Sequence, residues 1–468
     1  MVFSSYVFLF LFLPVVCIVY FILPERVKNG WLLASSLFFY GWNSPAFLPV
    51  LLVSIAVNYL AGRMIQTAAG KKRTAALAAG TITNLAILIY YKYADFIVEN
   101  LRKYLHLPVS EYGSIVLPLG ISFFTFQGMS YIIDVYRRDV CALTNPLDAA
   151  LYISLFPQLV AGPIVRFKNI AKQLHGRICT IEAAGYGFRR FVFGLSKKIL
   201  LADTFGMIAD GVFSNPESWN MGSTWIGILA YTLQIYYDFS GYSDMAIGLG
   251  AVFGFHLDEN FKYPYASTSI TEFWRKWHIS LSSWFRDYIY IPLGGNRVPW
   301  PRHIANVLIV WLLTGIWHGA EWSFFLWGVY YGVLLLMEKY LIRKKGSALK
   351  PLRWLFTMIL VMIGWVFFRS ANVTNALNYL QAMFSFKHTH EGFIIFMRRA
   401  TVYASFWIAG FAGIFPVAAR IKKMVLQVIK EESIFYAIAV NAYTAILLMV
   451  SVFFLIANNY NAFIYFQF

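Results

Sequence analysis

Apolar runs long enough to cross a lipid bilayer recur along almost the whole chain, and only short polar stretches separate them. Residues 3–23, 352–368 and 436–457 are clear examples. A membrane-spanning helix needs about 20 predominantly apolar residues, and lipid offers no partners for unpaired backbone N–H and C=O groups. Because 59% of the residues are hydrophobic and only 13% are charged, the chain cannot cover a water-soluble globule with polar side chains. The sequence therefore predicts an all-α, polytopic membrane protein.

The length of 468 residues leaves room for about 9 to 12 spanning or re-entrant helices. No long polar stretch marks a separate soluble domain, so we expect one membrane domain over residues 1–468. Glycine and proline interrupt the apolar pattern at residues 41–45 and 117–120. Such breaks are tolerated where neighbouring helices or a water-lined cavity satisfy the freed backbone groups. They indicate a thick helix bundle with re-entrant pieces.

The chain carries 39 Lys and Arg against 22 Asp and Glu, a formal net charge of +17. The basic residues form short clusters beside apolar runs, at residues 63–73, 343–345 and 420–423. Charges that set membrane topology lie in such places, so we expect no nucleic-acid partner and a cytoplasmic location for these clusters. The same reasoning predicts three consecutive spans at residues 352–368, 400–419 and 436–457.

An ionisable imidazole lies at the end of one apolar run. Residues 304–317 are followed by His318, which Trp317 precedes and Gly319 follows. A titratable group at membrane depth needs a partner or a water-filled cavity, so it is a functional-site candidate by default.

Residues 269–295 predict a helix with two distinct faces. Ser269 followed by Glu272 forms a capping box that opens the helix. At 100° per residue, one arc collects aromatic and aliphatic side chains, namely Phe273, Trp274, Trp277, Leu281, Trp284, Phe285 and Tyr288. The opposite arc is basic and polar, and His278 lies at the edge between the two. This pattern is typical of the mouth of a cavity or of a membrane-interface anchor in which His278 has no chemical role.

Two carboxylates, Asp238 and Asp244, interrupt the apolar segment 225–255. Each costs roughly 2.5 to 3.5 kcal/mol at the centre of a membrane helix, so both should face protein, water or a basic partner. Six residues correspond to about 240° on a helix, which puts the two on different faces and argues against a paired acid–base site. The alternative is that they orient helices through interhelical hydrogen bonds.

Familiar catalytic and metal-binding patterns are missing from the sequence. Cys17, Cys141 and Cys179 lack the spacing of a metal site or of a disulfide framework, and we predict no metal. The sequence has no phosphate-binding glycine loop, no nucleophile elbow and no metal-binding His-Glu-x-x-His helix. Physical reasoning thus leaves a multi-span protein with two tryptophan-flanked histidines, His278 and His318, forty residues apart.

Several motifs, in the same order along the chain, resemble those of the membrane-bound O-acyltransferases. They are residues 156–163 (FPQLVAGP), 234–250, 258–264 (DENFKYP), 273–284 (FWRKWHISLSSW) and 314–319 (TGIWHG). The motif region covers about residues 115–340, and further helices follow at 350–468. The chain is most similar to the bacterial branch of alginate O-acetyltransferase membrane subunits, which the ending at residues 463–468 also resembles. The D-alanyl transfer subunit of teichoic-acid modification shares the central motifs.

This resemblance implies a fold in which the helices surround a central tunnel, with amphipathic helices at the interface. His318 matches the histidine treated as catalytic in the family, and His278 matches a second polar position. The resemblance also implies residues that line or gate the tunnel or shape its cavity, namely Trp317, Trp277, Trp274, Asp238 and Asp244.

The implied reaction takes an acetyl group from a cytoplasmic thioester, acetyl-CoA, and passes it across the bacterial inner membrane. A neutral His318 would take the hydroxyl proton as the oxygen attacks the thioester. His278 would hold the tautomer of His318 or donate to the developing oxyanion. The acceptor is an envelope polysaccharide, and the branch implies an extracytoplasmic, esterase-like acetyltransferase as partner. Acetyl-CoA acts as donor substrate, and no cofactor is expected to be bound.

Other functions stay open on the sequence alone. D-alanyl transfer to teichoic acid uses the same central motifs. A proton-coupled polymer transporter or flippase would use the histidines as proton relays, and a non-catalytic scaffold would only hold an extracellular transferase. The acceptor is likewise open between alginate, cellulose, peptidoglycan and other wall polymers.

Overall fold

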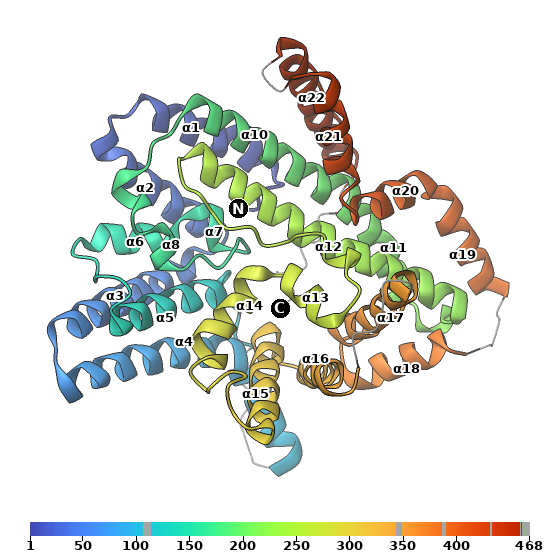
Figure 1. Cartoon of the computed structure of the whole chain (residues 1–468), viewed down its shortest axis with the longest axis horizontal. Helices are drawn as coiled ribbons and strands as arrows, with labels where there is room; N and C mark the ends of the chain where they lie inside the picture. Colours follow the sequence, from blue (N-terminus) through green and yellow to red (C-terminus); the bar gives the residue numbers. More distant parts are fainter. Residues whose placement is uncertain (106–113, 343–348, 386–389, 431–432, 459, 461–468) are drawn as a thin grey trace. The chain divides into compact units, whose positions relative to one another are not determined.

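The computed structural model describes residues 1–468 except for 106–113, 343–348, 386–389, 431–432, 459 and 461–468 (Figure 1). All regular structure in these described residues is helical, which confirms the all-α prediction. The chain divides into two compact units. The first comprises Met1–Phe191 and Met245–Asp258, and the second comprises Val192–Asp244 and Glu259–Phe468. The prediction of one membrane domain stays untested.

The first unit is built mainly from α1 to α10. Their bounds are α1 (Leu13–Ile22, preceded by the π-helix Phe8–Phe12), α2 (Glu25–Asn43), α3 (Leu48–Thr67), α4 (Gly70–Leu105), α5 (Ile121–Arg137), α6 (Pro146–Ser154), α7 (Phe156–Leu159), α8 (Phe167–Ile170), α9 (Gln173–Gly176) and α10 (Ile181–Ser196), whose last turn belongs to the second unit. Helices α3, α4 and α5 pack against one another and lie side by side in Figure 1.

Both predicted breaks occur in this unit. Helix α2 ends at Asn43, and the short 3-10 helix Pro45–Phe47 leads into α3. Gly120 precedes α5 with a φ of 72°, a conformation that glycine adopts without steric cost. A Cβ at Gly120 would also lie 2.5 Å from the carbonyl oxygen of Leu159. The absence of a side chain therefore lets the start of α5 approach the 156–163 motif.

The second unit contains the two candidate histidines. Its elements are the π-helix η3 (Lys197–Ala202), α11 (Asp203–Phe213), α12 (Met221–Val252, whose last residues belong to the first unit), α13 (Ile270–Lys276), α14 (Ile279–Phe285), the π-helix η6 (Arg286–Tyr290), α15 (Trp300–His318), α16 (Trp322–Tyr340), α17 (Lys350–Arg369), α18 (Val373–Met383), α19 (His390–Val402), α20 (Ala404–Gly413), α21 (Val417–Val428) and α22 (Ile434–Ala457). Two 3-10 helices, Pro216–Ser218 and Pro264–Ala266, lie in its loops.

Helices α15 and α16 form a closely packed pair. A Cβ at Gly315 would collide with the carbonyl oxygen of Phe324, and one at Gly328 would collide with that of Trp311. Small residues allow such close backbone approach between helices in membranes. This packing fixes the C-terminal end of α15, where His318 lies.

Four helices in the described part of the chain are long and apolar enough to cross a membrane, with bounds Pro45–Thr67, Gly70–Leu105, Lys350–Arg369 and Ile434–Ala457. A fifth span results if α20 and α21 are counted together. The span predicted at residues 400–419 corresponds to this bent pair, in which α20 and α21 meet at an angle of 74°. Pro416 lies at this break and lacks the N–H that a continuous helix requires. The predicted total of 9 to 12 spanning or re-entrant helices stays a prediction. The basic cluster at residues 343–345 lies outside the described residues.

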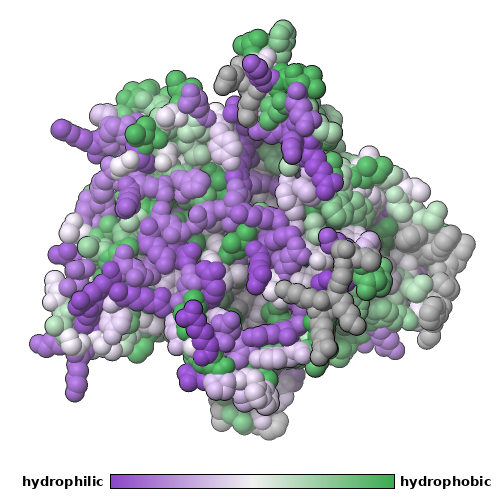
Figure 2. Space-filling model, viewed as in Figure 1, coloured by the Kyte–Doolittle hydropathy of each residue, from purple (hydrophilic) through white to green (hydrophobic). Residues whose placement is uncertain are grey.

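The C-terminal helices expose many apolar side chains. On α22, Phe435 is 74% exposed and Phe453 is 67% exposed. Figure 2 shows hydrophobic side chains together with hydrophilic ones on α21 and α22, at the top of the view. An apolar helix with this exposure suits a lipid environment, which agrees with a multi-pass membrane protein.

Candidate active site

His318 is the last residue of α15 and is only 5% exposed. Its ring packs against three aromatic rings, with centroid distances of 5.0 Å to Trp317, 5.0 Å to Trp327 of α16 and 5.1 Å to Phe368 of α17. The imidazole is therefore enclosed by aromatic side chains from three helices.

His278 lies at a helix break that the sequence did not predict. The expected single helix, opened at Ser269 and stopped by residues 291–295, is wrong, because α13 ends at Lys276 and α14 begins at Ile279 (Figure 1). His278 has a φ of 45°, in the left-handed region that non-glycine residues rarely adopt. The capping box is confirmed, since the Ser269 hydroxyl accepts a hydrogen bond from the backbone N–H of Glu272 at 3.1 Å.

The aromatic arc of this segment is confirmed as a buried face. Its seven members are each at most 7% exposed, whereas Arg275 and Arg286 on the opposite side are exposed. The arc packs inside the protein, so it does not act as an anchor in lipid. His278 is buried as well, at 1% exposure. Burial lowers the pKa of this loop histidine to about 3, because a buried site disfavours the charged imidazolium.

One tryptophan joins the two candidate histidines. The Trp317 ring lies 5.0 Å from His318 and 6.0 Å from His278, centroid to centroid. Phe239 of α12 contacts the other side of His278, edge-on at 4.6 Å. The structure therefore brings together His278, His318 and Trp317, which the sequence placed in one site by resemblance.

The other two predicted tryptophans belong to the aromatic core of the second unit. Trp277 packs on Trp365 at 4.9 Å. Trp274 contacts Trp311 at 4.7 Å and Trp327 at 5.5 Å. The tunnel-lining roles assigned to Trp274 and Trp277 stay predictions.

Both predicted carboxylates face basic partners, as expected. Asp238 lies 3.0 Å from the Lys198 ammonium, which also binds Asp203 at 2.7 Å. Asp244 pairs with Lys197 at 2.6 Å. The two aspartates use different lysines, as their separation around α12 predicts. These pairs join α12 to η3 and favour the helix-orienting role. The adjacent lysines 197 and 198, within an otherwise apolar run, were the signal for these partners in the sequence.

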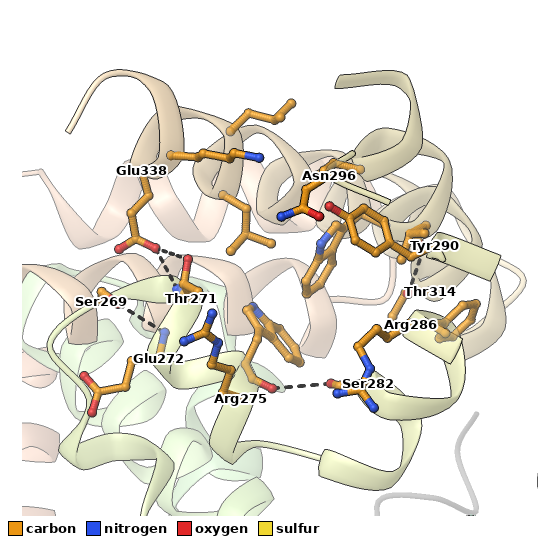
Figure 3. Close-up of a pocket in the computed structure, with 18 of the residues that line it drawn as sticks. Ser269, Thr271, Glu272, Arg275, Ser282, Arg286, Tyr290, Asn296, Thr314 and Glu338 are labelled. Atoms are coloured by element: carbon orange, nitrogen blue, oxygen red, sulfur yellow. Dashed lines mark hydrogen bonds between the residues drawn. The ribbon is translucent and has the colours of Figure 1, made fainter. Parts of the chain in front are cut away.

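A pocket of about 970 Å³ opens beside α13 to α16 (Figure 3). Its walls carry four basic side chains, those of Arg275, Arg286, Lys339 and Arg353. Two carboxylates also line it, but both already accept hydrogen bonds. Glu338 accepts from the backbone N–H of Thr271 at 2.7 Å, and Glu272 binds the Lys276 ammonium at 2.7 Å. Arg286 is itself paired with Asp287 at 2.7 Å. The other three basic side chains still make the pocket a site suited to an anionic ligand.

His303 braces one wall of this pocket. Its Nε2 accepts a hydrogen bond from the Lys339 ammonium at 2.9 Å, and its Nδ1 lies 2.9 Å from the Tyr340 hydroxyl. An ammonium group can only donate, so Nδ1 carries the proton of the neutral ring. Sequence reasoning missed this cluster, because His303, Lys339 and Tyr340 come together only when α15 packs on α16.

The inner end of the pocket approaches His318. Thr314 lines the pocket and lies one turn before His318 on α15, which is about 6 Å along the helix axis. Trp274 also lines the pocket and contacts Trp327, which in turn contacts His318. His318 is not among the lining residues. Trp274 and Trp327 thus lie in turn between the pocket and the imidazole, and the central tunnel stays a prediction.

Comparisons with known proteins identify the family of the chain. The family model for MBOAT, the membrane-bound O-acyltransferase family, matches residues 64–381. The chain is 45% identical to the probable alginate O-acetylase AlgI of Azotobacter vinelandii, over 82% of this chain and 78% of that protein. The corresponding protein of Pseudomonas putida is 40% identical over 100% of both chains. The peptidoglycan O-acetyltransferase of Helicobacter pylori is 37% identical, over 82% of this chain and 80% of its own length.

These matches confirm the resemblance, including the similarity to the alginate O-acetylase branch. The site residues are tested by none of them. The chain belongs to the membrane-bound O-acyltransferase family and is a multi-pass O-acyltransferase.

Proposed function

We propose that this enzyme takes an acetyl group from acetyl-CoA in the cytoplasm and passes it across the bacterial inner membrane for O-acetylation of an envelope polysaccharide. The relatives support acetyl transfer and a polysaccharide acceptor, since they are named as acetylases of alginate and of peptidoglycan. The acetyl group reaches the polymer directly or through an extracytoplasmic, esterase-like acetyltransferase.

The observation that carries this proposal is a basic pocket that reaches Thr314, one helical turn before His318, with the Trp274 and Trp327 rings between the pocket and the imidazole. Pockets of about 300–1,000 Å³ hold small molecules and cofactors, and this one has about 970 Å³. The guanidinium group of arginine carries paired N–H donors and a positive charge that match the oxygens of a phosphate group. The phosphates of acetyl-CoA would bind between Arg275 and Arg353, and the thioester end would point inward past Thr314. Movement of the Trp274 and Trp327 side chains would open a path from the pocket to the His318 ring.

The chemistry at His318 is general base catalysis. The acceptor oxygen forms a bond to the thioester carbonyl carbon while its proton passes to the unprotonated ring nitrogen of His318. The carbon–sulfur bond then breaks, and the leaving thiolate takes the proton, which yields an acetyl ester and free thiol. A positioned base of this kind contributes about 10²- to 10⁴-fold to the rate, and the aromatic shell keeps bulk water away from the thioester.

The test compares His318→Ala and His318→Gln with the unaltered enzyme in a strain where it is the only copy. Both variants should insert at normal abundance, and acetyl ester in the envelope polysaccharide should fall about 10²-fold or more. His256→Ala is the matched control, because His256 is an exposed histidine of the first unit. Full acetylation by either His318 variant would defeat the proposal.

Labelled acetyl-CoA distinguishes the remaining functions. Membrane vesicles with the enzyme should transfer label to endogenous polymer only when the thioester is supplied. A transporter would move unmodified polymer without a thioester, and a scaffold would transfer no label with any partner. D-alanyl transfer would leave labelled acetyl-CoA unused.

A further inference from the structure

Asn260 lies against His278 in the loop between α12 and α13, and its side chain is fully buried, at 0% exposure. The amide oxygen Oδ1 accepts hydrogen bonds from the backbone N–H of Ser280 at 3.1 Å and from the Ser280 hydroxyl at 2.9 Å. The same oxygen lies 3.3 Å from Nδ1 of His278. The main-chain oxygen of Asn260 accepts from the N–H of Ile279 at 3.0 Å. Asn260 thus holds the helix break from both its backbone and its side chain.

The orientation of this amide follows from its partners. The two ends of an asparagine amide look alike, and only the hydrogen-bond network distinguishes them. The backbone N–H of Ser280 can only donate, so the atom facing it must be the oxygen of Asn260. The group that faces His278 is therefore an acceptor with no proton of its own.

This orientation determines the tautomer of His278. A neutral imidazole carries one proton, and the nitrogen facing an acceptor must hold it. The Ser280 hydroxyl, 3.5 Å from Nδ1, gives its hydrogen to Asn260 and therefore also faces the ring as an acceptor. Nδ1 of His278 is consequently the donor, and Nε2 carries the lone pair. Nε2 is buried and has no hydrogen-bond partner among the residues that the structure describes. A buried polar atom without a partner costs about 1–3 kcal/mol, so a ligand group that donates to Nε2 would relieve this cost.

We propose that Asn260 is a positioning residue that fixes His278 as an Nδ1–H imidazole, so that Nε2 accepts a hydrogen bond from a hydroxyl of the polysaccharide acceptor. The proposal rests on the proposed function and decides between the roles considered for His278. A neutral His278 directs its one N–H, on Nδ1, at Asn260, so the ring has no second N–H to donate to an oxyanion. Sugars carry several O–H donors, whereas a thioester group carries none, so His278 recognises the acceptor and His318 keeps its role as base.

Two substitutions of Asn260 separate positioning from a merely structural role. Asn260→Asp keeps an acceptor oxygen for Ser280 and for Nδ1 but adds a negative charge, which raises the pKa of His278. The variant should stay active, but the fall of its rate at low pH (the acid limb of the pH–rate profile) should begin at a higher pH. The reason is that a protonated Nε2 cannot accept a hydrogen bond from the acceptor hydroxyl. Asn260→Ala frees the tautomer and should lower the rate about 10- to 100-fold without moving the limb.

His278→Asn is the complementary variant. Its amide nitrogen lies near the position of Nδ1 and can donate to Asn260, but nothing replaces Nε2. The variant should therefore accumulate normally and be as inactive as His278→Ala. Asn84→Ala is the control, because Asn84 is a buried asparagine of the first unit that exchanges hydrogen bonds with Asn58. Its acetylation per folded molecule should be unchanged.

The readout is transfer from labelled acetyl-CoA to endogenous polymer in membrane vesicles between pH 3 and 9, a range that includes the His278 pKa of about 3, normalised to folded enzyme. A shifted limb in Asn260→Asp, together with a slow but unshifted Asn260→Ala, supports the proposal. An unshifted limb in Asn260→Asp, or full rate in Asn260→Ala, overturns it. If His278→Ala and His318→Ala are inactive in that case, the proposed function still stands. If both are fully active, the proposed function itself fails.

Discussion

The two histidines of the site are held in different ways. His318 ends a long helix and is enclosed by aromatic rings, whereas His278 lies in a left-handed break between two short helices. A left-handed backbone costs a non-glycine residue roughly 1–2 kcal/mol. The contacts of His278 with Asn260 and Phe239 offset this cost. Strain of this kind is retained where the side chain has a use that glycine cannot supply.

Substituting His278 by Gly and by Ala separates backbone strain from chemistry. Both variants lose the imidazole and should lose acetyl transfer. The free energy of unfolding of His278→Gly should exceed that of His278→Ala by about 1 kcal/mol, because glycine adopts the left-handed conformation freely. His278→Gly should therefore unfold at the higher temperature. Thermal unfolding in detergent and envelope acetyl content measure the two effects. Equal stability of the variants would contradict the strain argument.

At the scale of the elements, the basic pocket depends on several helices that meet at one place. Arg275 comes from α13, Lys339 from α16 and Arg353 from α17. Glu338 holds the start of α13 by accepting from two successive backbone N–H groups, those of Ile270 and Thr271. This contact fixes the wall of the pocket that carries Arg275.

Removing one pocket cation should weaken donor binding more than catalysis. We expect Arg275→Gln to raise the KM for acetyl-CoA about tenfold, since a hydrogen bond to a charged group contributes about 1.5–3 kcal/mol. The value of kcat should change little, and added salt should raise KM in the unaltered enzyme. Arg26→Gln is the control, because Arg26 is exposed on α2 of the first unit. An unchanged KM for acetyl-CoA in Arg275→Gln would show that the donor does not bind in this pocket.

At the scale of the whole molecule, topology follows from apolar helices and basic clusters. The described part of the chain has four clear spans and the bent pair of α20 and α21. Helix α21 carries Arg420, Lys422 and Lys423, all exposed, beside exposed Ile421 and Met424. Basic clusters near membrane helices lie preferentially on the cytoplasmic side.

The side of the membrane on which α21 lies can be measured by labelling. Lys423→Cys, in a chain whose three native cysteines are replaced by serine, should react with an impermeant maleimide in inside-out vesicles. It should stay unlabelled in right-side-out spheroplasts, because the basic cluster is expected in the cytoplasm. Labelling in spheroplasts alone would reverse the orientation assigned to the C-terminal helices.

The sequence by itself determined the properties of this protein that depend on local chemistry. Composition and hydropathy determined the helical membrane class, and the short motif around Ser269 determined a capped helix start. The cost of burying charge predicted that Asp238 and Asp244 face protein, water or a basic partner, and both face lysines. Each of these properties depends on residues close together in the chain, so a sequence reports them directly.

Long-range packing decided the rest. The break at His278 overrides a continuous amphipathic pattern, because Asn260 pairs with Ser280 and His278 from another segment. The basic pocket collects residues from 268 to 353. The tautomer of His278 depends on which end of one amide faces Ser280. Such features arise from the distances between atoms that folding brings together, and periodicity along a single helix carries no information about those distances.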